Sequence, residues 1–190
     1  MDAIDTLARI EPGSTLDALR RRKPVTRNNA QASFDALFGA EARLPLRERA
    51  AVALFVAGLQ TDEPGQTLYG AMLADEPLHA AIAAEFKHAA TTGPYGAFPA
   101  GPLTREDLAG PSYTISAAGR AALGARLAAA FEQAHMLVFH PRDATPGAIR
   151  TLEAVGWSTP DIVTLSQLVA FLSFQLRAAH GLRALAGSLA

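Results

Sequence analysis

The sequence predicts an all-α fold. Apolar side chains recur every three or four residues along most of the chain, which is the period of an amphipathic helix, and few segments alternate as strands do. Capping residues or prolines open the expected helices, and glycines or prolines close them. With 190 residues, 49% of them hydrophobic, the chain is long enough for one helical domain with a sizeable core.

The first half of the chain contains the expected start and stop signals in order. Ser14 and Asp17 form a capping box that begins a short helix ending near Arg22. Residues 23–27, which Pro24 interrupts, are expected to be a linker. Four further helices are expected before the middle of the chain, at residues 28–38 (ended by Gly39), 46–59 (introduced by Pro45), 66–74 (after the Pro64-Gly65 break) and 75–92.

The second half begins with a loop and continues with long helices. Residues 93–111 are rich in proline and glycine and are expected to cross the surface as a loop. Three helices should follow, at residues 116–139 (capped by Ser116, ended by Pro141), 146–155 (ended by Gly156) and 159–183 (with a capping box of Ser158 and Asp161).

Two of these helices share an apolar pattern. If Glu48 is laid on Asp161, Val52 falls on Leu165, Val56-Ala57 on Val169-Ala170 and Leu59 on Leu172. This register predicts a pseudo-repeated helical unit. We therefore divide the chain into an N-terminal helical arm and linker, residues 1–31, and a helical domain, residues 32–190.

Composition excludes several classes of function. Lys and Arg number 17 and Asp and Glu 18, a net charge of −1, and the one basic run is residues 20–23, so nucleic acid is not expected as a partner. Residues 1–5 are acidic without an apolar signal core, and no apolar run reaches bilayer length, so we expect a cytoplasmic protein with no membrane contact. The chain has no cysteine, which excludes disulfides, zinc–thiolate sites and a thiol nucleophile.

The helix at residues 46–59 carries a candidate catalytic carboxylate. Its expected buried face consists of Val52, Phe55, Val56 and Leu59. Glu48 lies on the same stripe, and a carboxylate in apolar surroundings has a raised pKa and can act as a general acid or base. Alternatively, Glu48 interacts favourably with the helix dipole in the first turn and pairs with Arg47 or Arg49.

Residues 44–49, Leu-Pro-Leu-Arg-Glu-Arg, and residues 52–57, Val-Ala-Leu-Phe-Val-Ala, resemble the core helix of the AhpD-like and carboxymuconolactone decarboxylase superfamily. Residues 140–146 and 154–177 resemble the second half of the peroxidase-related branch of that superfamily. The resemblance covers about residues 32–185. It implies an AhpD-like all-α fold and a homo-oligomer (dimer, trimer or hexamer) whose helices cross the subunit contact.

In the thiol-dependent members, a glutamate is followed twelve residues later by Cys-x-x-Cys, and a histidine lies four residues after the second cysteine. The glutamate corresponds to Glu48, the cysteines to Gln60 and Glu63, and the histidine to Thr67. Because the sulfur is absent, thiol peroxidase activity is not expected. A polar set remains, to which Asp62 and Tyr69 also belong.

Two Glu-x-x-His pairs, Glu85/His88 and Glu132/His135, have the spacing found in ferritin-like di-iron sites, which require both pairs. Helical geometry turns His88 away from its apolar stripe, whereas His135 lies on one, so neither a metal nor a cofactor is expected. His135 is expected to be partly buried near a helix C-terminus, where the dipole favours its protonated form. Alternatively, it is a core-edge histidine bound to a neighbour.

The resemblance and these residues together suggest two functions. One is lyase or decarboxylase-like proton transfer on a small organic acid or lactone, with candidate site residues Glu48, Gln60, Glu63, Thr67 and His135. In this scheme Glu48 is the acid or base, and Gln60, Thr67 or His135 orients the substrate. The alternative is a non-catalytic oligomeric small-molecule-binding or scaffold protein, in which Glu48 is ion-paired with Arg47 or Arg49 and no pocket opens beside Gln60.

Overall fold

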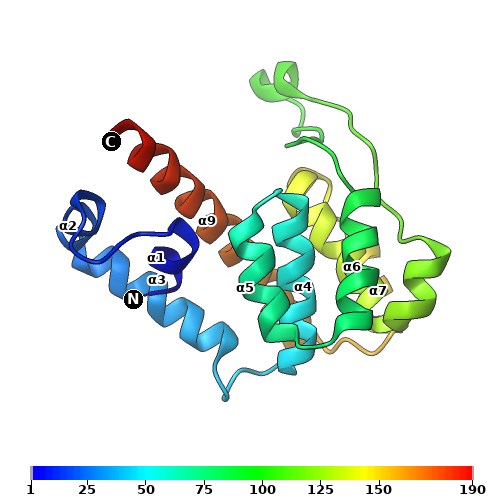
Figure 1. Ribbon diagram of the computed structural model, residues 1–190. Coiled ribbons are helices and arrows are strands. Elements are labelled where there is room, and N and C mark those ends of the chain that lie inside the picture. Colours follow the sequence, from blue (N-terminus) through cyan, green and yellow to red (C-terminus); the bar gives the residue numbers. More distant parts are fainter. Residues whose placement is uncertain (1, 190) are drawn as a thin grey trace.

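The computed structural model describes residues 2–189 and confirms the all-α prediction (Figure 1). Those residues contain no β-strand and a single isolated β-bridge, between Gly96 and Leu108. The α-helices of the described range are α1 Ala3–Ala8, α2 Thr15–Arg21, α3 Pro24–Phe38, α4 Leu46–Leu59, α5 Glu63–Leu73, α6 Glu76–His88, α7 Ala117–Phe139, α8 Pro146–Ala154 and α9 Thr159–Leu189. Two short 3-10 helices lie before and after α7, at Pro102–Glu106 and Pro141–Asp143.

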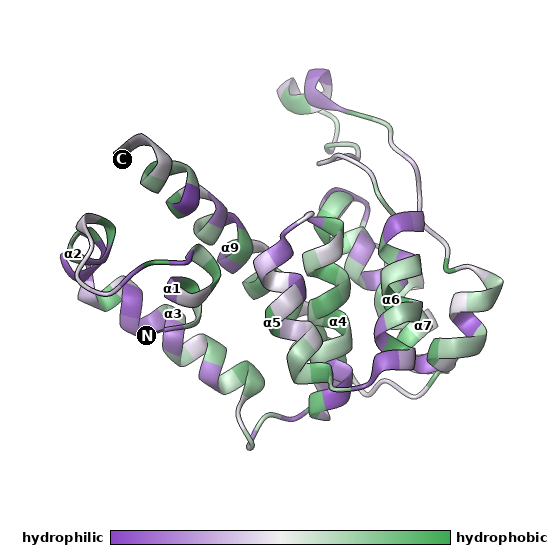
Figure 2. Cartoon of the chain, viewed as in Figure 1, coloured by the Kyte–Doolittle hydropathy of each residue, from purple (hydrophilic) through white to green (hydrophobic). Residues whose placement is uncertain are grey.

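Helix α4 lies at the centre of the fold. Every residue from Arg49 to Leu59 is buried, because α5, α6, α7 and α9 all pack against this helix. Figure 2 shows α4 as mostly apolar along its length. The sequence prediction of a single buried face was therefore too narrow, since a helix that is apolar all round is a core helix. Gly58 leaves room for the ring of Phe86 to lie directly against the α4 backbone.

The N-terminal arm is more ordered than expected. A first helix, α1, precedes the predicted α2, and Asp2 and Asp5 lie 2.7 Å from both Arg20 and Arg27. This network joins α1, α2 and α3 into one unit.

The predicted linker at residues 23–27 was wrong, because Pro24 occupies the first turn of α3, where a missing N–H costs no helical hydrogen bond. The boundary placed between residues 31 and 32 thus falls inside α3. Residues 1 and 190, the outer ends of the two predicted parts, lie outside the described residues.

Helix α9 is longer than the predicted 159–183 and contacts α1, α2, α3, α4, α7 and α8. Near its end, Arg183 donates to the backbone oxygen of Leu7 at 2.7 Å and pairs with Asp62 at the start of α5. By length and composition, Thr159–Ser188 is apolar enough to cross a membrane, but core helices of soluble proteins meet the same test. The packing of α9 against six other helices is compatible with a soluble protein.

Other helix boundaries differ from the predicted ones for local reasons. Helix α5 begins at Glu63 rather than residue 66, because the Asp62 side chain accepts the Gly65 N–H at 2.8 Å and caps a first turn containing Pro64. Helix α6 ends at His88 instead of continuing to residue 92. Helix α7 is kinked at Gly124, whose φ of 75° is readily available only to glycine. The 93–111 loop projects from the helical body in Figure 1.

Candidate functional site

Glu48 is held in an ion pair with Arg126 of α7. The Arg126 Nε lies 2.8 Å from one carboxylate oxygen and its Nη2 lies 3.3 Å from the other. Trp157 and Gly156 fix the guanidinium, which lies 4.0 Å from the Trp157 ring centroid and donates to the Gly156 oxygen at 2.5 Å. Both Glu48 oxygens therefore already have a partner.

The two arginines next to Glu48 in sequence have other partners. Arg47 pairs with Asp75 at 3.1 Å. Arg49 is buried and donates to the backbone oxygens of Leu37 and Gly39, at the C-terminal end of α3. The expected ion pair at Glu48 thus forms, but with a residue 78 positions away in the sequence rather than with a neighbour.

The register between α4 and α9 has a counterpart in space. Asp161, the residue aligned with Glu48, lies 3.9 Å from the same Arg126 and 2.7 Å from Arg43. Both first-turn acids therefore face one arginine. The aligned apolar positions, Val52 with Leu165 and Val56 with Val169, are buried, but Ala170 is exposed whereas Ala57 is buried. The pseudo-repeat itself stays a prediction.

A groove of about 400 Å³ opens at the other end of α4. It lies between the α4–α5 turn, residues 91–93, the end of α7 and the middle of α9, and its polar lining comprises Gln60, Thr61, Asp62, Thr91, Thr92, Arg177 and His180. Gln60 and Glu48 are twelve residues apart on one helix, which separates them by about 18 Å at 1.5 Å per residue. One small molecule cannot contact both.

The charge of the groove is set by Arg177. The carboxylate of Asp62 is buried, caps α5 and pairs with Arg183. Arg177 and His180, one turn apart on α9, form no ion pair or side-chain hydrogen bond within residues 2–189 and are exposed. The groove therefore offers an uncompensated positive charge to a ligand.

Of the predicted set, only Gln60 lines this groove. Its Nε2 lies 3.5 Å from Ser173 Oγ. Glu63 and Thr67 are exposed on α5, where the Thr67 hydroxyl donates to the Glu63 backbone oxygen at 3.0 Å. The structure does not bring Glu48, Gln60 and His135 together around one cavity.

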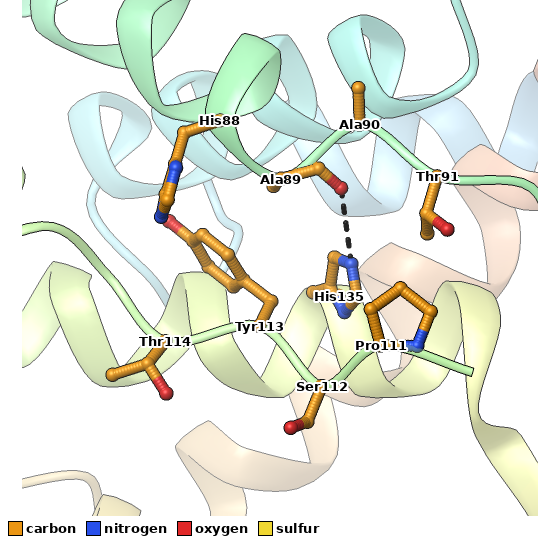
Figure 3. Close-up of a pocket in the computed structure, with 9 residues that line it drawn as sticks. All are labelled: His88, Ala89, Ala90, Thr91, Pro111, Ser112, Tyr113, Thr114 and His135. Carbon is orange, nitrogen blue, oxygen red and sulfur yellow. Dashed lines mark hydrogen bonds between the residues drawn. The ribbon is translucent and has the colours of Figure 1, made fainter. Parts of the chain in front are cut away.

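His135 lines a second, smaller cavity of about 110 Å³ (Figure 3). Its walls are residues 88–91, residues 111–114 and His135 of α7. His135 is 3% exposed, and its Nε2 donates to the backbone oxygen of Ala89 at 3.2 Å. Burial lowers the pKa of His135 to about 4, so the ring is neutral at neutral pH. The expectation that the helix dipole would favour its protonated form was wrong, because desolvation outweighs the dipole here.

Tyr113 forms the wall between His135 and His88. Its ring centroid lies 5.1 Å from that of His135 and 6.0 Å from that of His88. Its hydroxyl donates to the buried carboxylate of Glu85 at 2.6 Å, and Ser116 also donates to Glu85. Burial alone would raise the pKa of Glu85, but the hydrogen bonds from Ser116 and Tyr113 lower it overall.

In the sequence, Glu85 stood out only as half of a Glu-x-x-His pair, and its burial was missed, although a signal was present. Leu78, Ile82 and Glu85 are spaced by four and three residues and so share one face of α6, and all three are buried. Arg177 lies within a segment quoted for the family resemblance, but nothing in its spacing distinguished it from other surface arginines.

The two Glu-x-x-His pairs do not combine into a metal site. His88 is exposed at one side of the cavity, whereas His135 is buried on the other side of Tyr113. Glu132 accepts from the Ile115 N–H at 3.2 Å and from Arg120 at 2.9 Å. Among the described residues, no three or more His, Asp and Glu side chains are grouped so that they could hold a metal ion.

No family model, curated protein or solved structure matches this chain. The AhpD-like assignment therefore stays a prediction, and the case for function depends on the site geometry.

Proposed function

We propose that this chain binds a small organic acid in the groove at the C-terminal end of α4. The observation that carries the proposal is Arg177, an exposed guanidinium with no partner among residues 2–189. It faces a groove whose one carboxylate, Asp62, is already neutralised by Arg183. A guanidinium can bind a carboxylate through two parallel hydrogen bonds.

The other lining groups suit the remainder of such a ligand. The Gln60 amide and the hydroxyls of Thr91 and Thr92 can donate to or accept from hydroxyl or carbonyl groups. Leu59, Val138 and Phe139 supply an apolar wall. A volume of about 400 Å³ is within the usual range for small-molecule sites.

We further propose that the chain is a cysteine-free relative of the AhpD-like and carboxymuconolactone decarboxylase proteins, cytoplasmic and homo-oligomeric. The all-α fold and the central position of α4 support this relationship. The groove lies at Gln60, where the resemblance places the first thiol. On this proposal the groove is kept, and the amide of Gln60 stands where the thiol-dependent members have their first cysteine.

Binding without catalysis is better supported than proton transfer by Glu48. A general base must lie within hydrogen-bonding reach of the substrate, at a site where the substrate binds. Both oxygens of Glu48 contact Arg126, and the helix rise places Glu48 about 18 Å from Gln60.

The test is calorimetric titration of the full chain with acetate, pyruvate, succinate and benzoate, each compared with its neutral amide. At least one acid should bind, with its amide at least tenfold weaker. Arg177→Gln should weaken that acid at least tenfold, and Arg150→Gln, which alters an exposed arginine outside the groove, should not. Equal binding of acid and amide, or unchanged binding by Arg177→Gln, would contradict the proposal.

Glu48→Gln separates the two proposed functions. It should leave acid affinity within about twofold of wild type if the groove is the site. If Glu48→Gln removes binding while Arg177→Gln does not, the ligand is bound near Glu48 and the acid–base function is favoured.

A further inference from the structure

One ring nitrogen of His135, Nε2, has a hydrogen-bond partner, and the other, Nδ1, has none among residues 2–189. The backbone oxygen of Ala89 can only accept, so the Nε2 that faces it at 3.2 Å carries the proton. Because a neutral imidazole has one proton, Nδ1 is a bare acceptor. Burial keeps the pKa of His135 low, at about 4, so this tautomer is the relevant form at neutral pH.

That acceptor forms no hydrogen bond with any of residues 2–189, although the side chain is 3% exposed. In Figure 3 the ring lies between Ala89 and the segment Pro111–Thr114, with its second nitrogen turned away from Ala89. Both sides of this space belong to the cavity lining. Nδ1 itself is not fully buried, so a donor that enters the cavity can reach it. The hydrogen bond formed there would stabilise the bound ligand.

The surroundings select for a neutral ligand. The Glu85 carboxylate is occupied by Tyr113 and Ser116. The His140 ring centroid lies 6.1 Å from that of His135, and His140 is bound on both sides, by the Pro111 oxygen and the Asp143 carboxylate, each at 3.0 Å. Among residues 2–189, the acidic neighbours Glu85 and Asp143 are thus already hydrogen-bonded. Ser112 and Thr114 also line the cavity, but in Figure 3 their hydroxyls point away from His135.

The size of the cavity limits the ligand. A volume of about 110 Å³ is well below the roughly 300–1,000 Å³ of drug-sized ligand sites, so the cavity suits only a very small molecule. The ring of Tyr113 offers an aromatic face beside the His135 ring.

We propose that this cavity is a second binding site, separate from the groove, for a small neutral molecule with an N–H or O–H donor that binds to Nδ1 of His135. Azoles, amides and short alcohols share this chemistry. The site is independent of the organic-acid site, because His135 does not line the groove and Arg177 does not line the cavity.

The probes are pyrazole, which is neutral, has five ring atoms and carries one N–H donor, and 1-methylpyrazole, which lacks that donor. Long-range ¹H–¹⁵N spectra of the full chain should show saturable perturbation of His135 Nδ1 by pyrazole. 1-Methylpyrazole should bind at least tenfold more weakly. Equal binding of the two azoles, or a response at other residues only, would overturn the proposal.

Two variants test where pyrazole binds, so that the test still holds if one of them does not fold. His135→Phe removes the acceptor and should abolish the preference for pyrazole. Because that residue is buried, Pro111→Phe, at an exposed position whose ring lies beside His135 in Figure 3, serves as a second variant that should block the cavity, with Thr104→Phe in the exposed loop as its control. Wild-type affinity in a folded Pro111→Phe protein would contradict the proposal.

Arg177→Gln distinguishes failure of this proposal from failure of the proposed function. It should remove acid binding but leave pyrazole binding unchanged. Loss of both in this variant would show that the two ligands share the groove and that the cavity is not a separate site.

Discussion

The small cavity at His135 and the larger groove at Arg177 share Thr91 as a lining residue, yet the fold leaves a different group unpaired at each: the neutral Nδ1 of His135 in the cavity and the charged Arg177 in the groove. Around the cavity, Glu85, Tyr113 and Ser116 are bonded to one another, and His140 to Asp143. In the groove, Arg177 and His180 are exposed and bonded to nothing within residues 2–189. Polar groups that the fold already pairs stabilise the structure, whereas those left unpaired at a hollow are available to a ligand.

The two ends of α4 show the same difference. Glu48 looked like a catalytic residue, but it is paired with Arg126, whose guanidinium lies over the Trp157 ring. Gln60 looked like a lost cysteine, but it lines an open groove. Judged by residue type alone, Glu48 would have been the stronger candidate for a functional residue and Gln60 the weaker one.

The largest effect should come from titration of His135. Its pKa is about 4 in the folded protein and about 6.5 when unfolded, so the unfolded chain binds more protons between these values. Stability should therefore rise with pH across this window, and lowering the pH from 6.5 to 4 should cost about 3 kcal/mol. Urea unfolding at a series of pH values measures this.

His135→Gln should flatten that pH dependence between 4 and 6.5, whereas His180→Gln, in the exposed groove, should leave it in place. The groups with lowered pKa values, such as Glu85 and Asp143, lose their contribution mainly below this window. An unchanged slope in His135→Gln would show that His135 is not held neutral by the fold.

A smaller effect is expected at the paired end of α4. Arg126→Met leaves Glu48 without its partner and removes the contact with Trp157, so the free energy of unfolding should fall by about 1–3 kcal/mol. Arg120→Met is the matched control, because the Arg120 side chain is 49% exposed, against 31% for Arg126. In Arg120→Met the free energy of unfolding should fall by less than about 1 kcal/mol. If chemical denaturation shows the same loss of unfolding free energy in both variants, the Glu48–Arg126 pair contributes no more than an ordinary surface ion pair.

The smallest effect on stability is expected from Arg177→Gln. Because Arg177 has no partner within the described residues, its replacement should change the free energy of unfolding by no more than about 0.5 kcal/mol. Thermal and urea unfolding both measure this. A loss above about 1 kcal/mol would mean that Arg177 stabilises the fold, and the contrast between groove and cavity would fail.

Most of the helices could be predicted because their signals are local. The capping serines, Ser14 and Ser116, accept backbone N–H groups at the expected helix starts, and α4 has the predicted bounds. Pro24 and Pro64 were misjudged, since proline is as compatible with the first turn of a helix as with a break.

The site was less predictable because it is formed by residues far apart in sequence. The partner of Glu48 is 78 residues away, and the groove joins Gln60 to residues of α6–α7 and α9. Local spacing reveals which face a residue occupies, but not what it meets. His135 was placed on the correct face, but its protonation depends on the surrounding side chains, which the dipole argument left out.

The link between Arg183 and the Leu7 backbone has a consequence for synthesis of the chain. These residues are 176 positions apart, so α1 waits for most of the polypeptide before it can dock on α9. At translation rates of 5–20 residues per second, that interval is roughly 10–35 s. During it, α1 lacks its contacts with α9 and is held through the ion pairs that Asp2 and Asp5 form with Arg20 and Arg27.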